Sequence, residues 1–229
     1  MDPELMKDLP ESKVNEMAKN FLKTLSETED YNSSDCLPSL AFLQMKSVPS
    51  EHRSKDVLLR YFSNLSDVID VFQRIWKQLF PLESIFDESQ KLTWYILNLA
   101  TGFVWNGTDN CKIFSEKAVE KEIPKMMVKA LKDPRLLDEN DLPERQVQLL
   151  QGILCILHNI LHHVDCRQEV RDLGAVDALK PYSRKSNLLI RTQSLQVLAQ
   201  LVNERENNMI NAENDNIKLW VDMLEQGLK

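Results

Sequence analysis

Hydrophobic residues recur every three or four positions along most of the chain, a spacing that places them on one face of an α-helix. From Asp56 to Phe80 the apolar residues keep this period, and Pro81 ends the segment. Alternation with a period of two, typical of β-strands, is almost absent, and glycine occurs only five times in 229 residues. The pattern therefore predicts an all-α protein.

Polar and proline-containing interruptions divide this pattern into short helices. Loops are expected at "SETEDYNSSD" (26–35) and "KDPRLLDENDLPE" (132–144), and Pro124 is expected to divide the helical stretch that contains it. A helix that begins near Ser34 or Asp35, either of which can cap it, tolerates Pro38 in its first turn. Helices are expected over 14–25, 34–48, 56–80, 89–106, 111–132, 143–163, 165–172, 175–183, 188–204, 205–212 and 214–228.

The helical segments also repeat along the chain. Sliding "ILCILHNILHHVDC" over "SLQVLAQLVNEREN" places Asn159 over Gln200, which is a period of 41 residues. Repeats of ~40–47 residues with two or three helices each are typical of helical solenoids. An earlier copy places Asn98 at the repeated position, 61 residues before Asn159, with an insertion near 132–144; Asn106 is the alternative.

Two motifs resemble armadillo repeats. "TWYILNLA" (93–100) resembles the long third helix of that family, and "DLGAVDAL" (172–179) resembles its glycine turn, in which Gly174 permits a sharp bend between two helices. The resemblance implies a right-handed superhelical solenoid. We expect an irregular N-terminal helical portion at 1–88 and about three armadillo-like repeats at 89–229.

From Gln146 onward the chain resembles the armadillo-like region that precedes TIR domains in multidomain invertebrate proteins. "RDLGAVDAL", "IRTQSLQVLAQLVNE" and "INAENDNIKLWVDML" carry this resemblance. The chain itself lacks the strand and helix alternation that a TIR domain requires. The resemblance implies a regulatory or autoinhibitory segment of a signalling protein, with innate immunity as the expected setting and a TIR domain as one candidate intramolecular partner.

The armadillo resemblance also implies a peptide groove lined by the third helices. Its candidate residues here are Trp94, Asn98, Asn159, Gln196 and Gln200, because an amide both donates and accepts hydrogen bonds with a peptide backbone. The family repeats a Trp/Asn pair, whereas Cys155/Asn159 and Gln196/Gln200 replace it in the later copies. Burial of Trp94 in the core and a helix-to-helix bond from Asn159 are the structural alternatives.

A cysteine and histidine cluster is the sharpest alternative to a binding groove. Cys155, His158 and His162 share one helical face, with Cys166 close behind, and these residue types suit zinc or a thiol nucleophile. The expected turn before Cys166 and the absence of an orienting third group favour buried, structural side chains instead. The sequence contains none of the common hydrolase, metalloprotease or nucleotide-binding motifs, so we expect no catalysis and no cofactor.

A basic cluster surrounds another expected turn. Lys180, Arg184, Lys185 and Arg191 would attract an acidic partner, a phosphate group or a nucleotide, although a solvated turn is the favoured explanation. Over the whole chain 35 acidic residues outnumber 28 basic ones, for a net charge of −7, which disfavours nucleic acid.

We therefore interpret the chain as a protein-interaction or autoinhibitory module without catalysis. Its expected partner is a protein or peptide, and neither nucleic acid nor a membrane. The apolar stretches are too short for a bilayer span and no hydrophobic signal region begins the chain, so a cytoplasmic location with free thiols is expected. An oligomerising helical scaffold is a further alternative.

Overall fold

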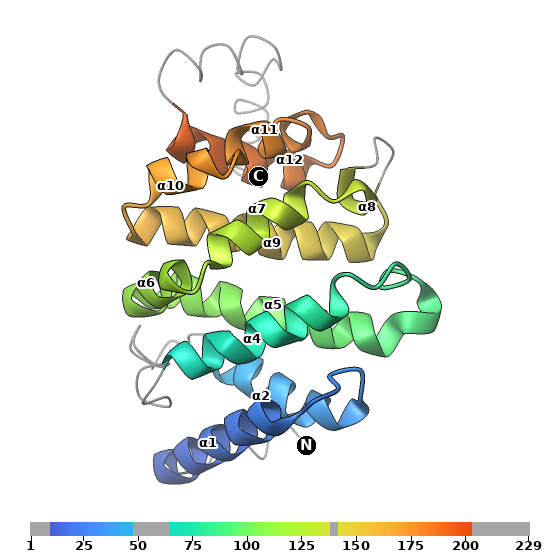
Figure 1. Cartoon of the computed structure of the whole chain (residues 1–229), viewed down its shortest axis with the longest axis vertical. Helices are drawn as coiled ribbons and strands as arrows, with labels where there is room; N and C mark the ends of the chain where they lie inside the picture. The colour runs from blue at the N-terminus through green and yellow to red at the C-terminus, as the bar shows by residue number, and fades with distance from the viewer. Residues whose placement is uncertain (1–9, 48–64, 138–141, 203–229) are drawn as a thin grey trace, which may run out of the picture.

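A computed structural model describes residues 10–47, 65–137 and 142–202, and all regular structure within these ranges is helical (Figure 1). The all-α prediction is therefore confirmed. The elements are α1 (Glu11–Glu27), η2 (Ser34–Cys36), α2 (Leu37–Ser47), α4 (Leu65–Leu79), η3 (Glu88–Gln90), α5 (Lys91–Asn110), α6 (Lys112–Glu120), α7 (Ile123–Leu131), α8 (Pro134–Leu137), α9 (Glu144–His163), α10 (Arg167–Asp172), α11 (Ala175–Leu179), η4 (Tyr182–Arg184) and α12 (Leu188–Leu201).

The helices form two rows. α2, α5, α9 and α12 pack side by side in that order with the most extensive contacts of the fold, and we call them the stacked row. α1, α4, α7 and α11 each pack on one member of the stacked row, and we call them the covering row. Figure 1 shows the layers following one another from the blue N-terminal helices to the orange α12.

The same order of elements recurs along the chain. A stacked helix, a short helix, a covering helix and the next stacked helix follow one another in α5–α6–α7–α9 and again in α9–α10–α11–α12. Each unit is too thin to enclose a core alone, so its apolar side chains are buried against the neighbouring units. The described helices therefore form an armadillo-like solenoid.

Two left-handed residues turn the chain between its short helices. Gly174 has φ 77° between α10 and α11, as the glycine turn predicted. Glu122 has φ 56° at the matching place between α6 and α7, where sequence reasoning expected only a break at Pro124. Pro124 instead lies in the first turn of α7, where its missing N–H costs nothing.

A glycine also sets the distance between two stacked helices. Gly152 is buried in α9, and a β-carbon there would lie 2.6 Å from Cγ2 of Thr101 in α5. Real carbon atoms pack at ~3.5–4.0 Å, so no side chain larger than hydrogen fits at this crossing. The close approach of α5 and α9 therefore depends on this residue.

Successive covering helices are tied together at their C-terminal ends. The last carbonyls of an α-helix lack partners within the helix and carry partial negative charge. Here side chains from the following repeat supply the donors. Arg74 donates to Leu25 O and Ser26 O at the end of α1, Tyr182 to Leu131 O at the end of α7, and Lys185 to Leu137 O at the end of α8. Arg135 donates to Phe80 O and Leu82 O in the turn that follows α4.

Other sequence expectations meet the structure less closely. Ser33, rather than Ser34 or Asp35, caps the second helix by accepting from the N–H of Asp35. The expected loop 132–144 contains the short helix α8. The expected helices 205–212 and 214–228, and the start of the one at 56–80, lie outside the described residues. The boundary at 88/89 stays a prediction.

Candidate functional site

The stacked row is built from uncharged sequence. The segments 36–45, 92–108, 146–164 and 192–202 cover most of its four helices and hold no Asp, Glu, Lys or Arg in a chain that is 28% charged. The exposed side of a surface helix normally carries such charges. This row presents amides, aromatic rings and small residues instead, and its exposed or half-buried members include Gln44, Tyr95, Asn98, Gly102, Trp105, Gln148, Gln151, Cys155, His158, Gln193, Gln196 and Gln200.

These residues recur every three or four positions on α5, α9 and α12, so on each helix they lie on its solvent side. We call this surface the amide face. Side chains of α9 and α12 contact each other across this face. Nε2 of Gln193 donates to Sγ of Cys155 at 3.2 Å, and Gln200 lies beside the ring of His158. Burial lowers the pKa of His158, which keeps the ring uncharged at neutral pH.

Trp94 and Asn98 form the aromatic part of the face on α5. Both are half-buried, and their spacing of four residues puts them on the same side of the helix. The guanidinium of Arg145 lies over the indole of Trp94, 5.5 Å from its centroid, and is held there by the carbonyl of Asp87 at 2.7 Å and the carboxylate of Glu88. Trp94 is thereby fixed as a wall beside Asn98.

Asn159 lies between helices rather than on the face. It is 7% exposed, and its Nδ2 approaches Trp105 O at 3.5 Å and Thr108 Oγ1 at 3.4 Å in α5. Asn106 does the same one repeat earlier, donating to Ser47 Oγ in α2 at 3.0 Å. Asn106 is thus the structural counterpart of Asn159.

The cysteine and histidine cluster is only partly assembled. Cys155, His158 and His162 share one side of α9, with the two imidazole centroids 6.5 Å apart, whereas Cys166 is buried at the start of α10. Within the part of the chain that the structure describes, no three His, Cys, Asp or Glu side chains are placed to hold a metal ion. Burial raises the pKa of Cys155 to about 12 and that of Cys166 to about 11.

Three of the four basic candidates surround one hollow. Lys180, Arg184 and Lys185 line a cavity of about 740 Å³ beside α8, while Arg191 lies on α12 and does not line it. Lys180 is paired with Asp177 at 2.8 Å, and Lys185 is 8% exposed and donates to Leu137 O. Both side chains therefore already have structural partners.

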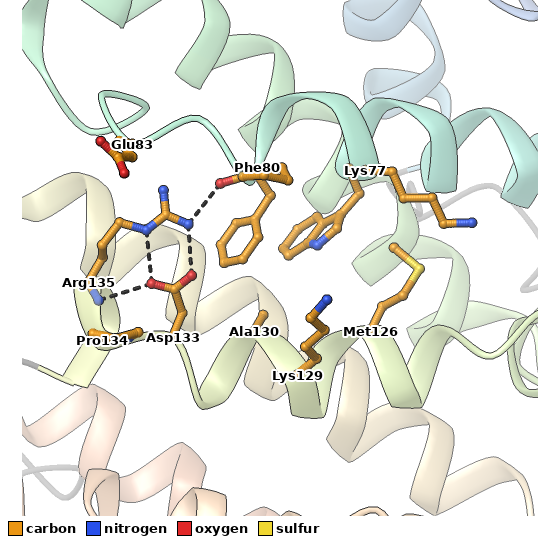
Figure 2. A pocket seen from close by; sticks show the side chains of 11 residues that line it. Lys77, Phe80, Glu83, Met126, Lys129, Ala130, Asp133, Pro134 and Arg135 are labelled. Carbon is orange, nitrogen blue, oxygen red and sulfur yellow. Dashed lines mark hydrogen bonds and ion pairs between the residues drawn. The ribbon is translucent and has the colours of Figure 1, made fainter.

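A larger cavity, of about 810 Å³, lies between the end of α4 and the α7–α8 segment (Figure 2). Sequence reasoning missed it. The amphipathic pattern assigned Trp76 and Phe80 to the core, and both side chains are buried there, so that only their edges reach the cavity.

The chain shows little similarity in sequence to known proteins. No family model matches the chain, and no curated protein matches it. Among solved structures, a designed armadillo repeat protein, YIII(Dq)4CqI, is similar with a TM-score of 0.43 and 14% identity, over 84% of this chain and 93% of that one. None of the helices in the described ranges is long and apolar enough to cross a bilayer.

Proposed function

We propose that the chain is a protein-interaction module that binds an extended segment of a partner polypeptide along the amide face. The observation that carries the proposal is the uncharged, amide-rich exposed side of the central parts of α5, α9 and α12. A peptide backbone presents alternating N–H and C=O groups, and amide side chains such as Asn98, Gln196 and Gln200 can satisfy both. An armadillo-like solenoid suits this work because it exposes a long surface for its length.

The dimensions of the row set the length of the segment. Neighbouring helices pack ~8–10 Å apart, so the path from α2 to α12 is roughly 30 Å. An extended chain advances ~3.3 Å per residue, so about nine residues cover the face. The bound segment should itself be poor in charge, because a buried charge without a partner is costly.

Selection from a library of random peptides tests this proposal. Peptides of about twelve residues are used, because they are longer than the roughly nine residues estimated from the rise per residue of an extended chain. The enriched peptides are measured by fluorescence anisotropy against the whole chain. Asn98→Arg and Gln196→Arg should each weaken binding about tenfold or more, because they place an unpaired charge under the peptide.

Asn20→Arg is the matched control, because Asn20 is an exposed polar residue on α1 of the covering row. It should leave the affinity unchanged. The proposal is wrong if no peptide is enriched, or if the control weakens binding as much as the two variants on the amide face.

The module is proposed to act without catalysis. The raised pKa values of Cys155 and Cys166 support this, because a protonated thiol is a weak nucleophile and a weak metal ligand. Metal analysis of the purified chain tests the rival zinc or thiol enzyme. Zinc at one equivalent per chain, lost together with a measurable hydrolytic activity on chelation, would contradict the proposal.

A narrower form of the proposal makes the chain the regulatory segment of a cytoplasmic signalling protein in innate immunity. The resemblance of the region from Gln146 onward to segments that precede TIR domains supports it. Sequencing the full-length transcript tests it directly. An in-frame TIR-coding region would support the regulatory role, and a complete reading frame without any effector domain would refute it.

A further inference from the structure

The cavity between α4 and α7 is lined in part by the edges of two buried aromatic rings, Trp76 at 4% exposure and Phe80 at 9%. Trp76 and Phe80 stack with ring centroids 4.9 Å apart and an interplanar angle of 18°. Figure 2 shows Met126 extending from α7 toward α4. The equivalent hollows, of about 650 Å³ between α1 and α4 and about 740 Å³ beside α8, are lined mostly by polar and charged residues. The stacked aromatic pair therefore distinguishes this site from its neighbours in the solenoid.

One end of the cavity is closed by an ion pair whose groups already have partners. Arg135 donates from Nε to Oδ1 of Asp133 at 2.9 Å and from Nη2 to Oδ2 at 2.8 Å. The same guanidinium donates to Leu82 O and Phe80 O and lies 4.9 Å from the centroid of the Phe80 ring. Hydrogen bonding from Arg135 lowers the pKa of Asp133, so the pair stays ionised and acts as a fixed wall.

Two lysines supply positive charge at the opening. Lys77 on α4 and Lys129 on α7 are exposed, and neither makes an ion pair with any residue that the structure describes. In Figure 2 the side chain of Lys129 points from α7 toward α4 across the opening, and Lys77 extends along α4 above Met126. The acidic lining residues are Asp133, which is paired, and Glu83 at the far end. The lining thus carries one more positive than negative charge, in a chain whose net charge is −7.

We infer that this cavity binds a small aromatic carboxylate. Its rings would lie against Met126 and against the ring edges of Trp76 and Phe80 that reach the cavity, because aromatic pairs favour edge-to-face contact. Its carboxylate would lie at Lys129 and Lys77. The excess of one positive charge matches a monoanion. The volume falls within the ~300–1,000 Å³ that small-molecule sites occupy. The site lies on the covering row and is independent of the peptide proposed for the amide face.

Naphthalene-2-carboxylate is a suitable probe, and naphthalene-2-carboxamide has the same rings without the charge. Titration calorimetry of the whole chain should give one site for the acid, and about tenfold weaker binding of the amide, because a charge-assisted bond is lost. In a ¹H–¹⁵N spectrum the acid should shift the indole resonance of Trp76, assigned with Trp76→Phe, and leave that of Trp94 in place.

Lys129→Gln should weaken binding of the acid about tenfold and leave binding of the amide unchanged. Lys19→Gln is the control, since Lys19 is an exposed lysine on α1 and does not line the cavity. The inference is overturned if the acid does not bind, if acid and amide bind equally, if both lysine variants have the same effect, or if the Trp94 resonance moves instead of that of Trp76.

Discussion

Replacing Gly152 by alanine would push α9 away from α5, and the size of the effect follows from a single contact. The new β-carbon would lie 2.6 Å from Cγ2 of Thr101, about 1 Å closer than carbon atoms pack. Thr101 is 1% exposed and its hydroxyl donates to Leu97 O at 2.8 Å, so the side chain cannot rotate away without losing that bond. Overpacking of this kind costs about 1–3 kcal/mol, and the better helix propensity of alanine returns about 1 kcal/mol. We expect Gly152→Ala to lower the free energy of unfolding by up to about 2 kcal/mol, the net of these two effects.

A second substitution should reverse the loss. Thr101→Ser removes Cγ2 and keeps the hydroxyl, and by itself it should cost about 1 kcal/mol for the lost methyl group. In the double variant the alanine methyl occupies nearly the space that Cγ2 leaves, because Cβ of residue 101 would be 3.8 Å away, an ordinary contact. The double variant should then equal the wild type within about 1 kcal/mol, which gives a coupling energy of about 1–3 kcal/mol.

Urea unfolding, followed by circular dichroism at the helical minimum, gives the free energy of unfolding of the wild type, the two single variants and the double variant. The comparison is valid if the dependence of the unfolding free energy on urea is the same for each. Additive effects of the two substitutions, within about 0.5 kcal/mol, would show that residues 101 and 152 do not face each other. That result would refute the order and register of the stacked row.

Three further predictions concern other parts of the fold. Tyr182→Phe should lower the free energy of unfolding by about 1–2 kcal/mol, since Leu131 O loses a buried donor at 2.7 Å; urea denaturation measures it, and an unchanged midpoint would contradict the contact. Gly174→Ala should cost about 1 kcal/mol because its φ of 77° is left-handed, whereas asparagine at the same position should cost less in the same assay. In the folded protein the thiol pKa values of Cys155 and Cys166 lie above the ordinary value of 9.0, so less of each thiol is ionised at pH 8. Iodoacetamide at this pH should therefore alkylate Cys155 roughly a thousandfold more slowly than in the unfolded chain, and Cys166 roughly a hundredfold more slowly. The rates should rise with pH well beyond 9, and mass spectrometry of the labelled peptides would detect equal rates if the thiols were exposed.

Local features of the sequence were sufficient to predict most of the helices and the glycine turn. The apolar period predicted α4, α5 and α9, and the glycine in "DLGAVDAL" predicted the left-handed turn at Gly174. These features depend on neighbours within a few residues, so a short stretch of sequence is enough to predict them. Glu122 escaped prediction because a non-glycine residue in that conformation leaves no sequence signature.

The sequence predicted the composition of the candidate binding surfaces but not which of their side chains are exposed. The uncharged segments can be read directly from the letters, but an apolar, amide-rich helix can face either the core or solvent. Contacts between repeats decide this, and they put Asn159 between α9 and α5 while leaving Asn98 and Gln196 on the surface.

The cavity beside Trp76 depends still more on tertiary structure. Its lining joins α4 to the α7–α8 segment, which lies about fifty residues further along the chain. The sequence by itself thus determined the helical class, the repeat and the uncharged character of the stacked row, because these follow from local periodicity and composition. Packing between repeats decided the register, the burial of each amide and the shape of the cavity, because those depend on which distant side chains meet.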